Sequence, residues 1–204
     1  NGLLDLFETD PDPRWLNGAT RTATALLKRF KEPETGVLYQ SEDRTDLLTR
    51  KVDLTDGAEP SGPGRALRLL ARLNALGAPG IDAKQIDKAL TRAAWILERA
   101  PNTAPSLAHV ADRMAMQSTE VILATDNLDR PEFIEFVNAF HSRVRPHTVL
   151  ASITPTTSSK LPDHLGLVGK EPGPSGFQAY VCHNGTCKQP TSELAVFESS
   201  LNQR

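Results

Sequence analysis

The sequence predicts an α+β fold, in which a helical portion (residues 1–117) is followed by a smaller α/β portion (residues 118–204). Two observations lead to this prediction. In the first portion, apolar residues recur at helical spacing in segments that proline and glycine separate, a pattern typical of helical hairpins. In the second portion, a strand, a helix and a strand follow one another within about 35 residues, which predicts a βαβ unit with a parallel strand pair.

The helical portion opens with a short helical segment at Leu3–Phe7 and continues with four longer helices. Their expected ranges, taken from the apolar spacing, are residues 14–31, 61–76, 82–99 and 105–117. Between the first two of these helices, residues 37–40 and 47–50 are expected to be short strands or extended segments on either side of a polar turn. No initiator Met precedes the first helical segment, so we expect the chain to be a piece of a longer protein.

The α/β portion is expected to contain three strands and two helices. The expected strands are residues 120–125, 147–153 and 177–182. Asp129 is expected to cap the helix between the first two strands, and Thr191 or Ser192 to begin a last short helix. Residues 154–175 are rich in Pro, Ser, Thr and Gly, which predicts a surface loop. Asn184–Gly185 predicts a tight turn.

The composition limits the classes of partner. With 23 basic and 25 acidic residues, the charges nearly cancel, so no nucleic acid or other polyanion is predicted as a partner. No apolar run reaches membrane-spanning length and no stretch resembles a signal peptide, so we expect no membrane partner and a cytoplasmic location. The first strand of the α/β portion is not followed by Gly-x-Gly-x-x-Gly, so dinucleotide binding is not expected, and no cofactor is predicted.

A polar turn, residues 50–64, lies directly before the second long helix and is the main candidate site. Its three acidic residues are Asp53, Asp56 and Glu59. Ser61 is a suitable N-cap, and Gly62 lets backbone amides come close to a ligand. Carboxylates beside a helix N-terminus can accept hydrogen bonds from sugar hydroxyls or act as acid and base. The alternative is structural: Asp56 caps or braces the turn, and Glu59 lies in solvent.

The two cysteines, Cys182 and Cys187, flank a four-residue loop. If this loop closes a hairpin, the sulfurs come close together, and a disulfide or a reactive pair is geometrically possible. Two cysteines are too few for a disulfide framework, and their spacing differs from the Cys-x-x-Cys of an oxidoreductase, so a structural role is the alternative. With His183 they would offer three bunched ligands without a second pair elsewhere, so no metal site is predicted.

The segment Tyr180–Thr191 resembles the Ala-Tyr-Val-Cys-x-x-x-x-Cys-x-x-Pro ending of the protein family catalogued as domain of unknown function 255, whose members carry an N-terminal thioredoxin-like domain. The polar turn is similar to a second family segment, Arg-Pro-Lys-Asp-x-x-Asp-Gly-Ala-x-Pro-Ser-Gly-Asn. The matching residues are Arg50, Asp53, Asp56–Ala58 and Pro60–Gly62. Two positions depart from this segment, because Val52 stands in place of the family lysine and Pro63 in place of its asparagine. Neither offers a ligand the polar group of the family residue.

The resemblance implies a thioredoxin-like domain followed by an (α/α)6 toroid, similar to those of N-acylglucosamine 2-epimerases, cellobiose epimerases and six-hairpin glycosidases. This chain would then be a partial toroid, with the last helical hairpins in residues 1–117, followed by a small α/β C-terminal subdomain in residues 118–204. Its partners would be the missing thioredoxin-like and barrel portions. Because four or five helices cannot close a ring of six hairpins, we expect the piece alone to be inactive.

The resemblance is compatible with two functions. In the first, the full-length protein is an enzyme of the sugar epimerase or isomerase type, and the residues of this chain that bind the carbohydrate are Asp53, Asp56, Ser61 and Gly62. None of the five histidines lies in a matching motif, so the catalytic acid and base would belong to the missing half. In the second, a non-catalytic toroid binds a ligand or partner and is coupled to thioredoxin-type redox function, in which Cys182 and Cys187 take part.

Overall fold

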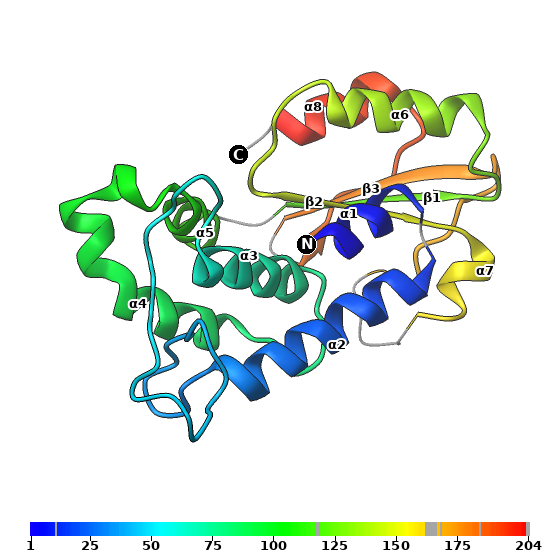
Figure 1. The fold of residues 1–204 in the computed structure, drawn as a ribbon. Coiled ribbons are helices and arrows are strands. Elements are labelled where there is room, and N and C mark those ends of the chain that lie inside the picture. Colours follow the sequence, from blue (N-terminus) through cyan, green and yellow to red (C-terminus); the bar gives the residue numbers. More distant parts are fainter. Residues whose placement is uncertain (11, 117–118, 162–166, 168, 184, 203–204) are drawn as a thin grey trace. The chain divides into compact units, whose positions relative to one another are not determined.

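The computed structural model describes residues 1–10, 12–116, 119–161, 167, 169–183 and 185–202. Within these ranges it has eight α-helices, one 3-10 helix and a four-stranded mixed sheet (Figure 1), so the predicted α+β class is confirmed. The chain divides into two compact units. The first, called here the helical unit, consists of Asn1, Asn17–Asn74 and Ala78–Met116. The second, the α/β unit, consists of Gly2–Leu16, Ala75–Gly77 and Gln117–Arg204.

The helical unit is built from the four long helices that the apolar spacing predicts. Its elements are most of α2 (Pro13–Phe30), α3 (Gly62–Ala75), α4 (Ala83–Arg99), the 3-10 helix η1 (Pro101–Thr103) and α5 (Pro105–Ala115). The carboxylate of Asp82 caps α4 by accepting a hydrogen bond from the backbone N–H of Gln85 at 2.9 Å. The buried residues of α4 recur at the predicted spacing and are Ile86, Ala89, Ala93 and Ile96. Helix α4 packs against α5. The expected end of α5 at position 117 lies outside the described residues.

The segment between α2 and α3 contains no helix or strand. Residues 37–40 and 47–50 form no strand, so the first of the two alternatives, a pair of short strands, is wrong. A single antiparallel bridge joins Lys31 to Leu38. The guanidinium of Arg50 donates hydrogen bonds to the backbone carbonyl of Ser41, the shorter at 2.8 Å, and lies 4.0 Å from the ring centroid of Tyr39. The backbone N–H of Tyr39 also donates to the carbonyl of Phe30 at 3.0 Å, and that of Gln40 to the carbonyl of Lys51 at 2.9 Å. Side-chain contacts and isolated backbone hydrogen bonds thus hold this segment without a strand ladder.

The α/β unit is organised around a sheet with the strand order β2-β1-β3-β4. Its strands are β1 (Thr119–Thr125), β2 (Thr148–Ile153), β3 (Phe177–His183) and β4 (Thr186–Cys187). Strand β1 pairs with β2 in parallel and with β3 antiparallel, so the predicted βαβ unit is confirmed. Helices α6 (Pro131–His141) and α8 (Leu194–Asn202) cover one face of the sheet, and α1 (Gly2–Thr9) packs against β2 (Figure 1).

Aromatic residues fill the core between the sheet and its two covering helices. The ring of Phe136 in α6 lies 4.7 Å from the centroid of Phe177 in β3 and 4.7 Å from that of Phe197 in α8. All three side chains are buried. Since α6 and α8 each contribute a ring, this cluster joins both helices to the sheet.

Three boundaries of the α/β unit differ from the prediction. Helix α6 begins at Pro131 and its N-cap residue is Arg130, so the expected cap by Asp129 is wrong. The loop expected over residues 154–175 contains one helical turn, α7 (Pro155–Ser158), which Thr154 caps through a reciprocal pair of hydrogen bonds with Thr157. Helix α8 begins at Leu194, after the residues expected to start it.

The expected turn at Asn184–Gly185 is described only in part, because Asn184 lies outside the described residues; Gly185 has a φ of 77°. Across the described part of the chain, we find no helix that is both long and apolar enough to cross a membrane.

Candidate functional site

The carboxylate of Asp56 is the best-connected side chain of the polar turn. Its Oδ1 accepts hydrogen bonds from the backbone N–H of Ser61 at 2.7 Å and from the hydroxyl of Ser106 at 2.6 Å. Its Oδ2 accepts from the backbone N–H of Ser106 at 2.7 Å. The backbone N–H of Asp56 itself donates to the carbonyl of Thr103 at 2.8 Å. Asp56 therefore links the start of α3 to the start of α5.

These contacts determine the protonation state of Asp56. Burial alone would raise the pKa of this carboxyl, but the hydrogen bonds donated by Ser106 and Ser61 outweigh burial and hold the pKa below its ordinary value of 3.8. Asp56 is therefore ionised at neutral pH. A general base works best when its pKa is close to the working pH, so this geometry favours the structural alternative for Asp56.

Ser61 acts as the predicted N-cap of α3. Its hydroxyl accepts a hydrogen bond from the backbone N–H of Gly64 at 3.2 Å and lies 3.3 Å from the hydroxyl of Ser106. The close approach of α3 and α5 requires glycine at position 64, because a Cβ there would lie 2.0 Å from Oγ of Ser106. Gly62 is exposed, and a Cβ added to it would meet nothing within 4 Å.

Asp53 has a separate set of partners. Its Oδ1 accepts from the hydroxyl of Thr55 at 2.7 Å and from the backbone N–H of the same residue at 3.2 Å, and Lys51 lies 3.4 Å from Oδ2. The hydrogen bonds from Thr55, followed by the contact with Lys51, lower the pKa of Asp53. The third acidic residue, Glu59, is 82% exposed at its side chain and forms a loose ion pair with Arg65 at 3.4 Å, as the structural alternative predicts.

A cavity of about 380 Å³ lies in the helical unit beside this turn. Its walls are mainly apolar, with Asp53, Thr55 and Arg92 among the polar residues. The apolar and aromatic residues that line it are Val37, Leu38, Val52, Leu54, Pro63, Leu67, Ala89, Ala93, Trp95, Ile96 and Leu107. Of the four residues predicted to bind substrate, Asp53 lines the cavity, whereas Asp56, Ser61 and Gly62 are not among its lining residues.

Sequence reasoning did not identify Arg92 and Trp95, two of the α4 residues that line this cavity. The side chain of Trp95 is 55% exposed, which is unusual for the largest apolar side chain. A signal was present in the sequence, because Trp95 lies outside the apolar stripe that defines the buried side of α4. A tryptophan off the buried face of an amphipathic helix indicates a contact other than the core.

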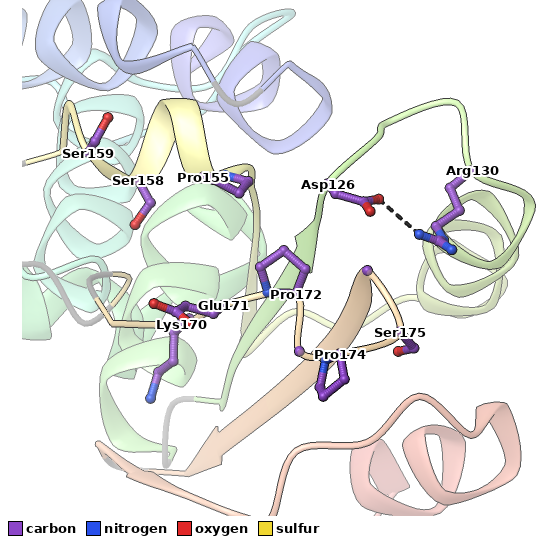
Figure 2. Close-up of a pocket in the computed structure, with 12 residues that line it drawn as sticks. Asp126, Arg130, Pro155, Ser158, Ser159, Lys170, Glu171, Pro172, Pro174 and Ser175 are labelled. Carbon is purple, nitrogen blue, oxygen red and sulfur yellow. Dashed lines mark hydrogen bonds and ion pairs between the residues drawn. The ribbon is translucent and has the colours of Figure 1, made fainter.

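A second hollow, of about 690 Å³, lies in the α/β unit at the carboxyl ends of β1 and β2 (Figure 2). Asp126, directly after β1, forms an ion pair of 2.9 Å with Arg130, and its backbone N–H donates to the carbonyl of Gly176 at 3.0 Å. A Cβ at Gly176 would lie 2.2 Å from Nη1 of Arg130. Ligands of open α/β sheets bind at this edge, but no sequence pattern predicted a site here.

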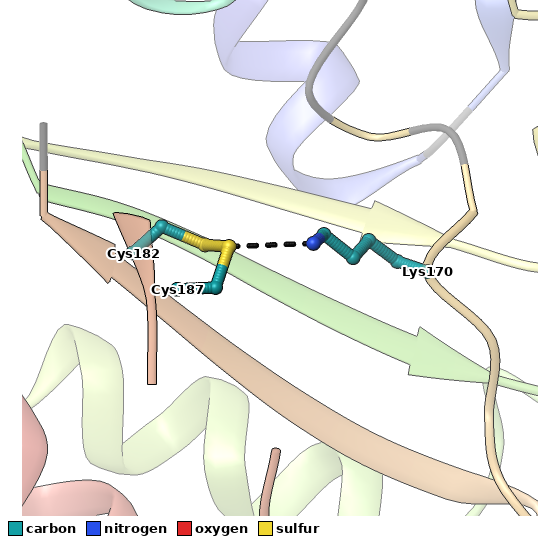
Figure 3. The surroundings of a disulfide bond; sticks show 3 residues. All are labelled: Lys170, Cys182 and Cys187. Atoms are coloured by element: carbon teal, nitrogen blue, oxygen red, sulfur yellow. Dashed lines mark hydrogen bonds between the residues drawn. A yellow bond between two sulfur atoms is a disulfide. The ribbon is translucent and has the colours of Figure 1, made fainter. Parts of the chain in front are cut away.

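Cys182 and Cys187 form a disulfide between the adjacent strands β3 and β4. Cys182 is 1% exposed, whereas Cys187 is exposed. The ammonium group of Lys170 lies 3.3 Å from Sγ of Cys187 (Figure 3). The sequence allowed either a disulfide or a reactive thiol pair here, and the structure contains the disulfide. Nδ1 of the neighbouring His183 lies 3.0 Å from the hydroxyl of Thr119, and no group of three possible metal ligands occurs among the described residues.

The chain is similar along its whole length to known proteins. It is 27% identical to human (Homo sapiens) spermatogenesis-associated protein 20 in an alignment of 207 positions that covers 98% of this chain. It is 24% identical to the protein of the same name from Mus musculus in an alignment of 205 positions that covers 99% of this chain. The chain is a distant relative of spermatogenesis-associated protein 20. It spans 26% of the length of each of these relatives. No family model matches the chain.

Proposed function

We propose that this chain forms one wall of a carbohydrate-binding site in a larger protein, which combines a thioredoxin-like domain with an (α/α)6 toroid. The observation that carries the proposal is the cavity of the helical unit, whose lining combines Trp95 with Asp53 and Arg92. Small-molecule sites are mainly apolar cavities with a few polar groups that set orientation. A sugar ring has an apolar face that can pack on an indole ring, while its hydroxyls can pair with a carboxylate and a guanidinium.

The proposal gives different roles to the four residues predicted to bind substrate. Asp53 contacts the carbohydrate directly, because it lines the cavity. Asp56 and Ser61 act through the backbone, since their hydrogen bonds hold the start of α3 against the start of α5. Gly62, exposed at the first residue of α3, completes the turn.

We propose further that the full-length protein isomerises or epimerises its carbohydrate, with the acid and base supplied by other parts of that protein. Proton abstraction at a sugar carbon needs a base whose pKa is near neutral. Asp53 and Asp56 both have a lowered pKa, so each is suited to accept hydrogen bonds from a ligand or from the backbone rather than to remove a proton from carbon.

A second candidate function is non-catalytic. In this alternative the cavity binds a ligand or partner without turnover, and the disulfide of the α/β unit takes part in a redox function coupled to the thioredoxin-like domain. Two observations favour it: the engagement of Asp56 by three hydrogen-bond donors, and the presence of a bonded cysteine pair in which one residue, Cys187, is exposed.

The test uses the full-length protein with a panel of reducing sugars and N-acyl hexosamines in deuterated water, followed by NMR. Binding with deuterium entry at the carbon next to the carbonyl supports the isomerase proposal, whereas binding without exchange supports the non-catalytic alternative. Trp95→Ala and Asp53→Asn are each expected to weaken sugar binding by about tenfold or more, equal to about 1.4 kcal/mol. Glu59→Gln is the matched control and should bind normally. Absence of binding across the panel would overturn the carbohydrate proposal.

A further inference from the structure

We infer that Cys182 and Cys187 form a thiol–disulfide exchange site, in which an external dithiol attacks the sulfur of the exposed residue Cys187 and Lys170 stabilises the thiolate formed on that sulfur. The inference rests on the redox role proposed above for the two cysteines. It is independent of the carbohydrate cavity, which belongs to the helical unit.

The first support is the unequal exposure of the two sulfur-bearing residues. Cys187 is exposed on β4, a two-residue strand at the edge of the sheet. Cys182 is 1% exposed on β3, between β1 and β4. Exchange requires a thiolate to reach one sulfur while the other departs, so the structure makes Cys187 the attacked sulfur and Cys182 the leaving group.

The second support is the position of Lys170. Its ammonium group lies 3.3 Å from Sγ of Cys187 and 5.1 Å from the ring centroid of Tyr180, which holds the cation next to the sulfur. A cation at this distance favours the thiolate over the thiol, as in reactive cysteines of other proteins. Lys170 is therefore a positioning residue: it acts through Cys187, whose thiolate it stabilises.

The third support is a carboxyl group beside the buried sulfur. Glu120 of β1 is directly opposite Cys182 of β3 in the antiparallel register, so their side chains lie on the same face of the sheet. Burial raises the pKa of Glu120, and the charge of Lys170 only partly offsets this effect. A partly buried carboxyl next to a buried sulfur can donate a proton to the departing Cys182 thiolate and accept it again when the disulfide re-forms.

The exchange proceeds in two steps. In the first, one thiolate of the dithiol bonds to Sγ of Cys187, the Cys182–Cys187 bond breaks, and its electron pair goes to Cys182, which takes a proton from Glu120. In the second, the other sulfur of the dithiol loses its proton to Glu120 and attacks its own partner sulfur in the mixed disulfide, so that Cys187 leaves as a thiolate beside Lys170. The dithiol is oxidised by two electrons and the disulfide is reduced by two.

The test measures Cys187 as a nucleophile in the Cys182→Ser variant of the full-length protein. Oxidised glutathione is added at pH 7, and the mixed disulfide on Cys187 is followed by peptide mass spectrometry. When Lys170→Met is added to the Cys182→Ser variant, the cation beside the sulfur is lost, and we expect the pKa of the Cys187 thiol to rise by about one unit. The thiolate fraction then falls about tenfold while its nucleophilicity rises about threefold, so the rate falls about threefold. Lys170→Arg should restore the rate, and Lys160→Met, at an exposed lysine, should not change it.

The pH profile of alkylation by iodoacetamide gives a second measure of the Cys187 pKa. Other titratable groups on neighbouring elements are Tyr180 and His183 on β3, Glu120 on β1, and Lys188 next in the chain. Lys170 donates a hydrogen bond to the sulfur of Cys187, so its replacement should shift the profile to higher pH. An unchanged profile and rate in Lys170→Met would overturn the role of Lys170.

Reduction of the unaltered protein by dithiothreitol separates this inference from the redox function on which it rests. If the disulfide is reduced in the native protein at a rate independent of low urea concentrations, the redox function stands, and the Lys170 variants decide the inference. If reduction requires unfolding and accelerates steeply with urea, the disulfide is a structural link and both are overturned. Trp95→Ala, which tests the cavity, should leave the reduction rate unchanged.

Discussion

Asp56 and Ser106 are fifty residues apart in the sequence, yet two hydrogen bonds join them. The backbone N–H of Ser106 donates to Oδ2 of Asp56 at 2.7 Å, and its hydroxyl donates to Oδ1 at 2.6 Å. The backbone N–H of Ser61 adds a third bond of 2.7 Å. One carboxylate thus satisfies backbone N–H groups at the start of both α3 and α5, where a helix offers no carbonyl partner of its own.

Asp56→Ala should destabilise the fold because it removes an acceptor shared by two helix starts. We expect the free energy of unfolding to fall by about 2 kcal/mol, the upper range for loss of an N-cap. The measurement is urea unfolding followed by tryptophan fluorescence. Glu59→Ala, at an exposed carboxylate of the same turn, is the control and should leave the midpoint nearly unchanged. Equal effects of the two substitutions would show that Asp56 does not stabilise the turn.

The contribution of Asp56 should also depend on pH. Its pKa in the folded state is below the ordinary value of 3.8, so protonation favours the unfolded state. The stabilisation is therefore complete above the ordinary pKa and is lost as the pH falls through the folded-state pKa. The unfolding free energy of the wild type minus that of Asp56→Asn should stay constant above about pH 5 and shrink below about pH 4. A difference that grows on acidification would contradict this assignment.

Gly64→Ala should disrupt the contact between α3 and α5, whereas Gly62→Ala should not. An added Cβ at Gly64 would lie 2.0 Å from Oγ of Ser106, but one at Gly62 meets nothing within 4 Å. We expect a loss of about 1–3 kcal/mol for Gly64→Ala, typical of overpacking. The Gly62 variant also tests the predicted role of this residue in binding: normal sugar affinity would show that Gly62 does not contact the ligand.

Gly176→Ala should separate Asp126 from Arg130. Its Cβ would lie 2.2 Å from Nη1 of Arg130 and 2.3 Å from Oδ2 of Asp126, and its φ of 79° disfavours any side chain. Gly169→Ala is a matched control, since Gly169 has a φ of 77° with nothing near an added Cβ. Both variants carry the backbone penalty, so the extra loss in Gly176→Ala, expected to be about 1–3 kcal/mol by thermal unfolding, isolates the steric clash. Similar losses in both would show that the ion pair can move aside.

Phe136→Ala should strongly destabilise the α/β unit, because its ring contacts Phe177 and Phe197. The expected loss is about 3–5 kcal/mol, as for other buried aromatic residues. Ile134→Ala in the same helix is the control, since Ile134 is 46% exposed. Near-ultraviolet circular dichroism during urea unfolding would follow the aromatic cluster. A small loss for Phe136→Ala would mean that the cluster collapses around the cavity.

The helices with a long apolar periodicity could be predicted from the sequence, and so could interactions between residues that are close together in the chain. The spacing of Ile86, Ala89 and Ala93 defines the buried side of α4, and the hydroxyl of Ser61 caps α3 as its residue type suggests. The short loop between the two cysteines likewise made a disulfide geometrically possible, and the structure contains it. In each case the deciding interaction lies within one or two turns of the chain.

Contacts between distant segments could not be predicted. The sequence shows that Asp56 can accept hydrogen bonds from a helix start, but not that Ser106 provides two of them. It likewise suggested Asp129 as the cap of α6, whereas the cap position belongs to Arg130, whose guanidinium pairs with Asp126. These outcomes depend on which segments fold against each other, and neither residue type nor local spacing contains that information.

The packing of α1 against β2 has a consequence for synthesis on the ribosome. Strand β2 begins roughly 140 residues after α1 ends. At a translation rate of about 5–20 residues per second, β2 is therefore synthesised roughly 7–30 s after α1. Nearly the whole sequence of the helical unit is translated in that interval and can fold first. Leu4 and Phe7 of α1, which are buried in the fold, therefore lack their partner strand throughout that interval, during which a chaperone can bind α1.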